Sequence, residues 1–523
     1  MTHRTRALIC CFAHVPALML GVAVNLVVNG YQFGLSNHSV YLIDALRRSE
    51  PALLANDWFY TQTFQYHSVF GWLTALLLQA GILEPAFALI YAGLLVGLHG
   101  SWRALVGMLG GGDREYLLSV VLYFLSAGGI GLGTYQFLQD SCVLASNVAN
   151  VAMFAGVVAW IGNRRLLGAV LLAMSGIFHL NHAVVVLFIY FAMAVYDNRR
   201  QPLRWLQPAF LAATAIICMA AAANLAPAVQ AKLSRPGGMP LSEFVDLYVK
   251  LRHPHHYDPA SWPFALWLAF CIWLPPAGAW MLLTRRGIRP LRSDDPSADP
   301  AVEPAPGVDS SAPTCDPSAE ARQRCRDRAV VVPGLFLFLQ VVALLFAGFW
   351  YVSETLIQMS LFRFSIMAHV MMVLFASLLL SRWKPIGYVL PALMALALLL
   401  ALLSPMEQTA RQRAGPIAAL ILLGFCPLAA PLLRGHPKVS AAIGTLVLAA
   451  LLISPNYLTG LTRPLVQVDA DYRALCRWVR DNTPVDAVFL TPPTDEDIRW
   501  HARRANVVKY KTKTQQSTEI TTW

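Results

Sequence analysis

The sequence predicts an all-α protein that crosses a membrane many times and carries a small α/β tail at its C-terminal end. Composition is the first observation: 57% of the 523 residues are hydrophobic and only 13% are charged, with a mean hydropathy of +0.52. Soluble domains carry about 25% charged residues, so this chain has too little polar surface to coat a water-soluble globule. The second and third observations are apolar stretches of membrane-spanning length and the basic runs that separate them.

The apolar stretches set the expected number of membrane segments. A full span needs about 20 residues, and counting full and short stretches gives about 11–14 segments. The short stretches 67–82, 147–162, 166–178 and 183–196 are expected to be tilted, half-spanning or re-entrant, which is tolerated where protein buries them. The other expected segments are 7–29, 85–102, 116–134, 205–225, 263–283, 330–350, 364–381, 386–403, 416–433 and 438–453.

The basic runs predict the orientation, because Lys and Arg mark the cytoplasmic side of membrane proteins. They place residues 163–165, 197–204, 284–329, 382–385 and 434–438 in the cytoplasm. The hairpin tip 178–182, the loops 226–262 and 351–363 and the tail 454–523 then face outward. Since the basic N-terminus is also expected inside, the number of full crossings must be odd, and we expect the stretch 67–82 not to cross. The protein is thus predicted to be a multi-pass protein of a bacterial-type inner membrane, with a cytoplasmic N-terminus and an extracytoplasmic tail.

The domain organisation follows from changes in composition along the chain. Residues 293–320 are rich in Pro, Ser, Ala and Asp and cannot bury a core, which predicts a disordered cytoplasmic linker. In the tail, helical spacing predicts a helix over 471–481, followed by a strand at 487–490, a helix at 495–504 and a strand at 507–510. The predicted units are a first span (1–29), a first extracytoplasmic loop with interfacial helices (30–66), an N-terminal multi-span module (67–284), the linker (285–329), a C-terminal multi-span module (330–453) and the tail (454–523).

The charge pattern argues against nucleic-acid binding, and the cysteine pattern argues against a metal site built from cysteines. The net charge of +11 comes from short basic runs between apolar stretches, and a basic groove interleaved with aromatic residues is absent. Nucleic acid is therefore not an expected partner. The nine cysteines form no C-x-x-C pair and no metal-binding spacing, and several fall within apolar runs.

Asp44 is one of two candidate catalytic residues, both of which lie in the first outward loop. Residues 42–54 have the pattern of an amphipathic helix at the membrane interface. Asp44 precedes Arg47 and Arg48 by three and four positions, so we expect it to pair with them on one helix face.

Asp57 is the other candidate, and it has no basic neighbour in the loop. It is followed by Trp58, Phe59 and Tyr60, and an ionised carboxylate among aromatic rings is costly unless it is used or paired elsewhere. It suits general-base activation of an acceptor hydroxyl, and it equally suits holding a divalent cation such as Mg²⁺ or Mn²⁺ against a phosphate. The alternative is an aromatic-belt anchor in which Asp57 caps the next helix.

The outward loop 226–262 contains a dense group of cations and imidazoles. Such a group suits binding of a phosphate or diphosphate, and its histidines also have some likeness to a metal site. We favour anion binding because Pro254 interrupts the group and no H-x-x-x-H helix spacing is present. A solvated loop without a role is the remaining alternative. The residues concerned are Arg252, His253, His255, His256 and Tyr257.

Further substrate-binding candidates come from other outward segments. His179 and His182 lie at the tip of a short hairpin, where the alternative is a purely interfacial role. Arg363 lies at an outward helix junction, and an Arg at that depth usually has an anionic partner, such as a lipid phosphate, a substrate phosphate or Glu354. The first loop adds Asn37, His38 and His67.

The arrangement resembles the GT-C class of glycosyltransferases, which use polyprenyl-phosphate-linked sugars. In architecture the resemblance covers most of the chain: a first span, a long first outward loop with interfacial helices and an acidic residue, a multi-span module and an extracytoplasmic tail. Three motifs are similar to those of an uncharacterised subfamily of GT-C-like bacterial membrane proteins. They are Asn37-His38…Tyr41…Pro51…Asn56-Asp57-Trp58-Phe59, Arg252-His253-Pro254-His255-His256-Tyr257 and Trp478-Val479-Arg480-Asp481-Asn482-Thr483-Pro484…Ala487-Val488-Phe489-Leu490.

The resemblance implies inverting transfer of a hexosyl or pentosyl group from a polyprenyl-phosphate donor on the periplasmic face. Asp57, or second to it Asp44, would be the base or metal holder, although the loop lacks the acidic pair or D-x-D common in better-known members. Membrane lipids and the lipid-linked sugar are the expected partners, and a group of outward cations would hold the donor phosphate. Two alternatives stay open: a lipid or solute transporter, and a non-catalytic protein of the same architecture. The phosphate-holding residues would be Arg252, His255, His256 and Arg363.

Overall fold

The computed structural model describes 366 of the 523 residues of the chain, and it is mostly helical. The expected spans 386–403, 416–433 and 438–453 lie outside the described residues. The described residues are 15–34, 37–125, 129–130, 138–234, 237–285, 317–381, 470–492, 498–507, 509, 512 and 514–522.

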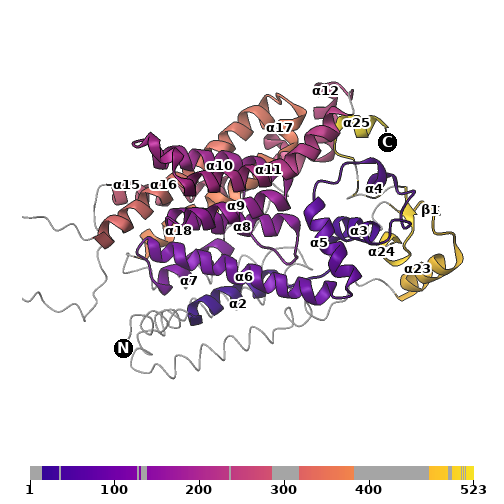
Figure 1. The fold of residues 1–523 in the computed structure, drawn as a ribbon, viewed down its shortest axis with the longest axis horizontal. Coiled ribbons are helices and arrows are strands. Elements are labelled where there is room, and N and C mark those ends of the chain that lie inside the picture. The colour runs from indigo at the N-terminus through magenta and orange to yellow at the C-terminus, as the bar shows by residue number, and fades with distance from the viewer. Residues whose placement is uncertain are drawn as a thin grey trace, which may run out of the picture.

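The first half of the chain forms a bundle of helices (Figure 1). Most of the predicted apolar stretches are found as helices within a few residues of the expected bounds. The helices are α2 (Val15–Asn29), α3 (His38–Ser49), α4 (Trp58–Gln62), α5 (Ser68–Gln79), α6 (Leu83–Met108), α7 (Asp113–Leu125), α8 (Ala145–Ile161), α9 (Arg165–Phe178), α10 (Leu180–Asn198), η1 (Pro202–Leu206) and α11 (Pro208–Leu233).

The middle of the chain adds a run of short elements and then further long helices. The short elements are α12 (Leu241–Phe244), the π-helix η2 (Val245–Arg252), α13 (Pro254–Tyr257) and η3 (Pro259–Ser261). The others are α14 (Phe264–Cys271), α15 (Leu274–Arg285), α16 (Pro317–Ala343), the π-helix η4 (Leu344–Phe349), α17 (Glu354–Gln358), η5 (Leu361–Phe364) and α18 (Ser365–Leu380).

Among the described residues, five helical segments are long and apolar enough to cross a membrane: Leu83–Met108, Leu180–Asn198, Pro208–Leu233, Glu320–Phe349 and Glu354–Leu380. The stretch expected not to cross, 67–82, forms the 12-residue helix α5. At 1.5 Å per residue, such a helix is roughly 18 Å long, which is shorter than a hydrocarbon core of about 30 Å. The other short stretches form α8, α9 and α10, of which α10 reaches spanning length.

Two predicted boundaries differ from the structure. The stretch 263–283 is two helices, α14 and α15, because Pro275 and Pro276 supply no backbone N–H to continue the first helix. Part of the predicted linker 285–329 is helical, since α16 begins at Pro317. The cause is tertiary: the Arg328 guanidinium is buried and pairs with Asp197 at 3.0 Å, which fixes this end of α16 against the bundle.

Helix α8 is the centre of the bundle, with every residue except Ala155 buried. Its closest neighbour is α9, and the two backbones approach where two glycines face each other. A Cβ on Gly156 would lie 3.0 Å from the Leu172 backbone nitrogen, and a Cβ on Gly168 would lie 3.0 Å from the Gly156 carbonyl oxygen. Small residues at helix interfaces permit this close approach in membrane bundles.

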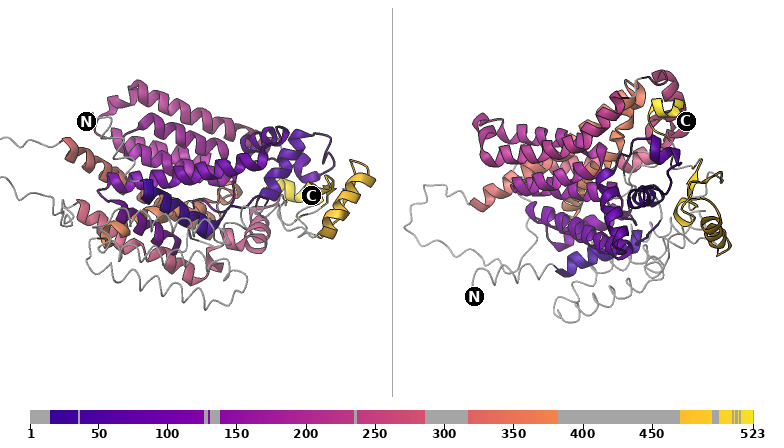
Figure 2. Two further views of the ribbon diagram at one scale, coloured as in Figure 1. Left: turned by 90° about the horizontal axis from the view of Figure 1, so that it is seen from below. Right: turned by 45° about the vertical axis from the view of Figure 1, so that its right-hand side comes forward.

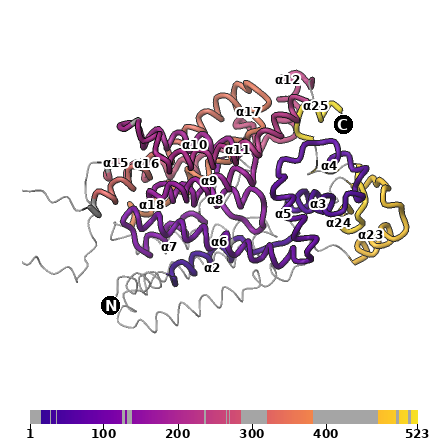
Figure 3. The backbone as a smooth tube through the Cα atoms, in the orientation of Figure 1, coloured from indigo at the N-terminus to yellow at the C-terminus, as the bar shows by residue number. Residues whose placement is uncertain are grey.

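The loops that the charge pattern places outside gather at one end of the molecule. Helices α3, α4, α12 and α17 lie at this end together with the C-terminal tail, whereas α15 and the start of α16 lie at the other (Figure 1). Figure 2 shows from two further directions that the tail, in yellow, lies against the first-loop helices. The tube in Figure 3 shows that these parts come from opposite ends of the sequence.

The tail is a small α/β unit made of α23 (Ala470–Asn482), β1 (Val488–Phe489), α24 (Ile498–His501), β2 (Ala505–Asn506) and α25 (Ser517–Thr522). The strands are parallel, with Val488 opposite Ala505 and Phe489 opposite Asn506. The predicted first helix and first strand are confirmed, and α24 is found within the range predicted for the second helix. The second strand lies at Ala505–Asn506, just before the predicted range 507–510. Within that range Val507 and Lys509 are not in a strand, and residues 508 and 510 lie outside the described residues.

Replacing Gly156 with valine is expected to destabilise the bundle, because a Cβ there already meets Leu172 at 2.9 Å and overpacking costs about 1–3 kcal/mol. Thermal unfolding of the purified protein in detergent measures the effect. Gly93→Val is the matched control, since a Cβ on Gly93 in α6 meets no atom within 4 Å. Equal unfolding temperatures for the two variants would show that the glycine contact does not limit the packing of α8 and α9.

Candidate functional site

A cavity of about 870 Å³ opens at the end of the molecule where the outward loops gather. Its walls come from the first loop, the tip between α9 and α10, the segment around α13, the junction of α17 and η5, and the end of the tail. Ligand pockets of proteins have volumes of about 300–1,000 Å³, so this cavity has room for a substrate. Its charged and imidazole-bearing wall residues are Asp44, His67, Asp140, His179, Lys232, His256, Arg363 and Glu519.

The structure brings together about half of the residues that the sequence singled out. Those that line the cavity are Asn37, Asp44, His67, His179, His256, Tyr257 and Arg363. Those that lie elsewhere among the described residues are His38, Asp57, His182, Arg252, His253 and His255.

Asp57 is buried beneath the tail and does not line the cavity. Its carboxylate is inaccessible to solvent, and its Oδ2 lies 2.6 Å from Nε of Arg499 and accepts a hydrogen bond from the Asn506 backbone N–H at 3.2 Å. Its Oδ1 accepts from the Tyr60 N–H at 3.4 Å, so Asp57 is the N-cap of α4. The helix-cap alternative for Asp57 is thus confirmed, and its location corrects the expectation that this carboxylate opens into a substrate cavity.

Arg499 distributes its donors between the first loop and the tail. Its Nη1 donates to the Thr512 hydroxyl at 2.6 Å and its Nη2 donates to the Asn506 carbonyl at 2.9 Å, while its guanidinium lies 5.5 Å from the centre of the Tyr60 ring. A buried charge is tolerated when its hydrogen-bonding groups are satisfied in this way. The Asp57–Arg499 pair therefore anchors the tail to the first loop.

Asp44 is the first-loop carboxylate that faces the cavity. It lies on α3 and pairs with Arg48 at 2.7 Å and with Arg47 at 3.7 Å, which confirms the predicted i,i+4 and i,i+3 pairing. The close approach of α5 at Gly71 supports this geometry, since a Cβ there would lie 2.4 Å from Asp44 Oδ2. The other oxygen, Oδ1, is buried and accepts no hydrogen bond from the described residues.

Arg363 is the cation at the centre of the histidines. Burial, with a further contribution from the nearby positive charge of Arg363, lowers the pKa of His67 to about 4 and that of His256 to about 2. The same two causes lower the pKa of His255. These imidazoles are therefore neutral near pH 7, so the fixed positive charge on this side of the cavity is the guanidinium itself.

A chain of aromatic contacts links the histidines of the first loop and the hairpin tip. The His67 and His179 ring centres lie 4.7 Å apart, and so do those of His179 and His182. His182 lies behind the wall, where its Nε2 is 2.9 Å from the Asn150 side-chain oxygen. His38 also has a structural position, because its Nδ1 accepts from the Gly34 N–H and its Nε2 lies 2.8 Å from the Val143 carbonyl oxygen.

The end of the tail closes the cavity, a feature that sequence reasoning missed. Gln515, Gln516 and Glu519 line it. Glu519 Oε1 accepts from the Phe64 N–H at 3.1 Å, and the Gln516 amide lies 3.2 Å from the Tyr66 hydroxyl. The amphipathic pattern of residues 471–481 indicated a folded tail, but no local pattern marks 514–522 as part of a site.

The tail is also held by the loops on the far side of the cavity. Glu354 accepts from the Ser517 N–H at 3.0 Å and from its hydroxyl at 2.8 Å, and the Gln358 amide donates to the Gln515 carbonyl at 2.7 Å. Arg252 donates to the Thr514 carbonyl. Arg252 therefore fixes the tail from outside the cavity wall.

Comparisons with known proteins identify the tail only. The model of one family, a domain of unknown function (DUF6798), matches residues 470–523. No curated protein matches the chain. The matched segment is the one that packs on the first loop and supplies Glu519 to the cavity.

Breaking the buried pair is expected to release the tail. Asp57→Ala leaves the Arg499 guanidinium buried without its partner, which typically costs about 3–5 kcal/mol. Limited proteolysis of the tail and thermal unfolding both measure this loss. The double variant Asp57→Ala/Arg499→Met is expected to lose less than the sum of the single variants.

The exposed pair between Glu50 and Arg503, which are 3.2 Å apart, is the matched control. Because both side chains are about half exposed, Glu50→Ala is expected to cost less than about 1 kcal/mol. Equal protease sensitivity of the tail in the Asp57 and Glu50 variants would contradict the anchoring role of Asp57.

Stability is expected to fall with acid because of His38. Burial lowers its pKa to about 4, against an ordinary value of 6.5, so the unfolded state takes up the proton first as the pH falls. Neutral His38 contributes about 3 kcal/mol to the free energy of unfolding. This contribution is complete above pH 6.5 and is lost as the pH falls from 6.5 to about 4. Unfolding temperatures measured from pH 7.5 to 4 should fall less steeply for His38→Gln than for the wild type, and equal slopes for the two proteins would contradict this role of His38.

Proposed function

We propose that the chain is a multi-pass inner-membrane protein of GT-C-like architecture that transfers a sugar from a polyprenyl-phosphate donor. The observation that carries the proposal is the polar cavity at one end of an apolar bundle, with a carboxylate and a guanidinium in its wall. The carboxylate is Asp44 and the guanidinium is Arg363. Asp44 takes the role that the sequence pattern favoured for Asp57.

The membrane part of the proposal rests on apolar surface that none of the described residues covers. Only 22% of the most apolar window of α11 is buried, and on it Leu211 is 51% and Met219 65% exposed. Monomeric soluble proteins rarely expose contiguous apolar surface on this scale, and lipid is the solvent that suits it. The same reasoning applies to Leu89 of α6, which is 74% exposed.

The orientation rests on the two ends of α9 and α10. Their shared tip carries His179 and lies in the cavity wall, whereas Arg165 and Asp197 lie at the opposite ends of the two helices. Arg328 joins Asp197 there at 3.0 Å. By the positive-inside rule the arginine-rich end is cytoplasmic, so the cavity is extracytoplasmic, as is the tail that closes it.

The catalytic part rests on Oδ1 of Asp44, which lies 3.7 Å from the Arg47 guanidinium and accepts no hydrogen bond from the described residues. A buried carboxylate oxygen without a hydrogen bond is unfavourable until a donor reaches it, and an acceptor hydroxyl in the cavity is such a donor. In the reaction the acceptor oxygen bonds to the anomeric carbon of the sugar and its proton passes to Asp44. The bond from that carbon to the phosphate oxygen breaks, and polyprenyl phosphate leaves with the electron pair.

The phosphate is placed beside Arg363 because that guanidinium is the permanent cation among neutral imidazoles. Planar guanidinium groups bind phosphate oxygens by paired, charge-assisted hydrogen bonds. Lys232 lines the cavity as well and adds a second positive charge. Neutral His256 contributes hydrogen bonds and not charge, which changes the role that the sequence pattern indicated.

Glu519 brings a carboxylate from the tail to the cavity, in addition to Asp44 and Asp140. The first loop lacks an acidic pair, and Glu519 lies 455 positions after Phe64, the first-loop residue that it contacts. Glu354 and Arg252 bind the tail and so hold Glu519 in place. The position of this carboxylate therefore depends on the fold of the tail. In this proposal Glu519 orients the sugar, as an acceptor for its hydroxyl groups.

Asp44→Asn is expected to abolish most sugar transfer, since general-base catalysis contributes about 10²–10⁴-fold in rate. Deletion of the chain from its host should cause a polyprenyl-phosphate-linked sugar to accumulate, and Asp44→Asn should fail to reverse this when the variant is correctly inserted. Arg363→Met is expected to weaken binding of polyprenyl phosphate by about 10–100-fold, the effect of losing a charged hydrogen bond.

Asp246→Asn is the matched control for both variants, because Asp246 is an exposed carboxylate that pairs with Lys250 at 2.8 Å. It should restore the wild-type lipid profile. Tight binding of polyprenyl phosphate without any change in lipid-linked sugars would favour a lipid-binding or transport protein. Full activity of Asp44→Asn would overturn the assignment of the base.

A further inference from the structure

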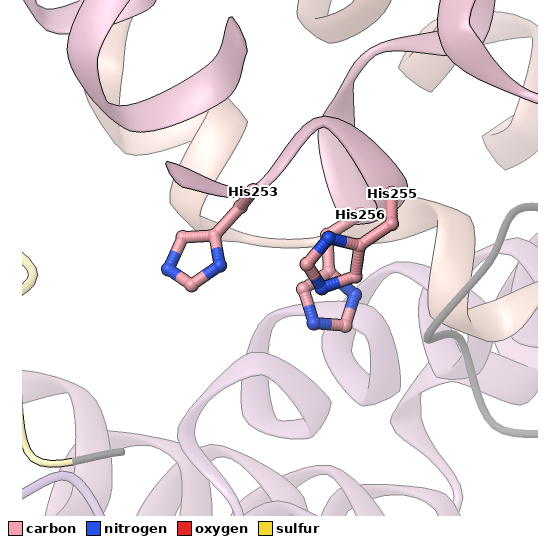
Figure 4. A group of neighbouring side chains, drawn as sticks. All are labelled: His253, His255 and His256. Atoms are coloured by element: carbon pink, nitrogen blue, oxygen red, sulfur yellow. The ribbon is translucent and has the colours of Figure 1, made fainter. Parts of the chain in front are cut away.

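The segment before α14 places three imidazoles on one side of a single helical turn. His253 is the N-cap of α13, and His255 and His256 lie within it. Pro254 occupies the first helical position, where its fixed φ favours a helix start. The proline therefore does not interrupt the histidine group, as the sequence pattern indicated, but begins the turn that assembles it. Figure 4 shows the three side chains leaving the same side of the turn.

The three rings are close enough to share one ion. Each offers one ligand nitrogen, and these nitrogens all lie within 4.8 Å of one another. Zn²⁺–N bonds of about 2.0–2.1 Å place tetrahedral ligand nitrogens roughly 3.4 Å apart. Rotation of the imidazole side chains needs to shorten the separations between the three nitrogens by only about 1 Å to reach that spacing. Among the described residues, these three histidines form the group of three or more His, Cys, Asp or Glu side chains whose ligand atoms lie close enough together to hold one metal ion.

From this geometry we infer that His253, His255 and His256 bind a divalent transition-metal ion, of the Zn²⁺ class, at the rim of the cavity. Imidazole nitrogen suits Zn²⁺, Ni²⁺ or Cu²⁺, whereas Mg²⁺ and Mn²⁺ prefer oxygen ligands. Three protein ligands leave a fourth position open, as in zinc sites that bind a water or a substrate. His256 also lines the cavity, so an ion held by these three residues would lie at its wall.

The state of the rings agrees with a metal site. Metal ions bind an imidazole through the lone pair of a ring nitrogen. The buried Nδ1 of His256 makes no hydrogen bond to the described residues. A metal ion would supply a partner for this nitrogen.

Arg363 sets the conditions under which the ion binds. Its positive charge lies close enough to influence His255 and His256, so it opposes a bare cation. An anion that contacts both the ion and the guanidinium removes this opposition. Metal and phosphate are then expected to strengthen each other's binding, and by linkage the two effects must be equal. The inference stands apart from the proposed transferase activity, because it is tested by metal and phosphate binding alone.

The test uses the full chain, purified in detergent without a histidine tag. We expect about one Zn²⁺ per chain by elemental mass spectrometry, and a visible absorption band typical of tetrahedral nitrogen ligation when Co²⁺ replaces Zn²⁺. His255→Ala/His256→Ala should lose the ion. Inorganic phosphate should raise the affinity for Co²⁺ about tenfold or more in the wild type and have no such effect in Arg363→Met.

Two controls separate this site from other histidines and from misfolding. His179→Ala alters the neighbouring group of rings, whose centres lie 4.7 Å apart, and it should keep the ion, as should His501→Ala. His253→Gln keeps a polar side chain and should weaken binding while the unfolding temperature of the metal-free protein stays unchanged. Retention of one ion by the double variant, or phosphate binding that is equally tight without metal, would overturn the inference.

Discussion

The buried ion pair between Asp57 and Arg499 is the interaction on which the organisation of the outer end depends. Charges taken out of water must be satisfied by other groups, and Arg499 meets this need by binding Asp57, Thr512 and the Asn506 carbonyl together. One guanidinium thus holds the first loop, the second strand and the chain that follows it. The position of Glu519 in the cavity follows from this arrangement, because the chain between residues 512 and 519 is short.

Local patterns predicted the helices well and the site only in part. Apolar stretches and the Asp44–Arg48 spacing are properties of neighbouring residues, so the sequence revealed α5–α11 and the ion pair on α3. The partner of Asp57 lies 442 positions away, and no local pattern identifies it. The second strand was misplaced for the same reason, since Asn506 is fixed by its contact with Asp57 and not by the apolar residues that follow.

Neutral rings near Arg363 characterise the chemistry of the cavity. The three histidines that line it, His67, His179 and His256, would with this arginine indicate a strongly positive surface if they were read from the sequence alone. Burial reverses this for the imidazoles, since a protonated ring in low dielectric costs more than a neutral one. The cavity therefore has few charges at neutral pH, and Arg363, Lys232, Asp44, Asp140 and Glu519 determine its field. The histidines contribute lone pairs and ring surfaces instead.

The closure of the cavity by residues 514–522 has a consequence for how the molecule assembles. The backbone of Phe64 and the carboxylate of Glu519 meet across 455 positions. Each doubling of the length of a loop adds only about 0.6 kcal/mol to the entropic cost of closing it. The long separation therefore costs little stability at equilibrium, but contacts between residues far apart in the sequence form slowly. We therefore expect the first loop and the hairpin tip to form before the tail closes the cavity. Completion of the pocket would then be a late event, separate from insertion of the helices.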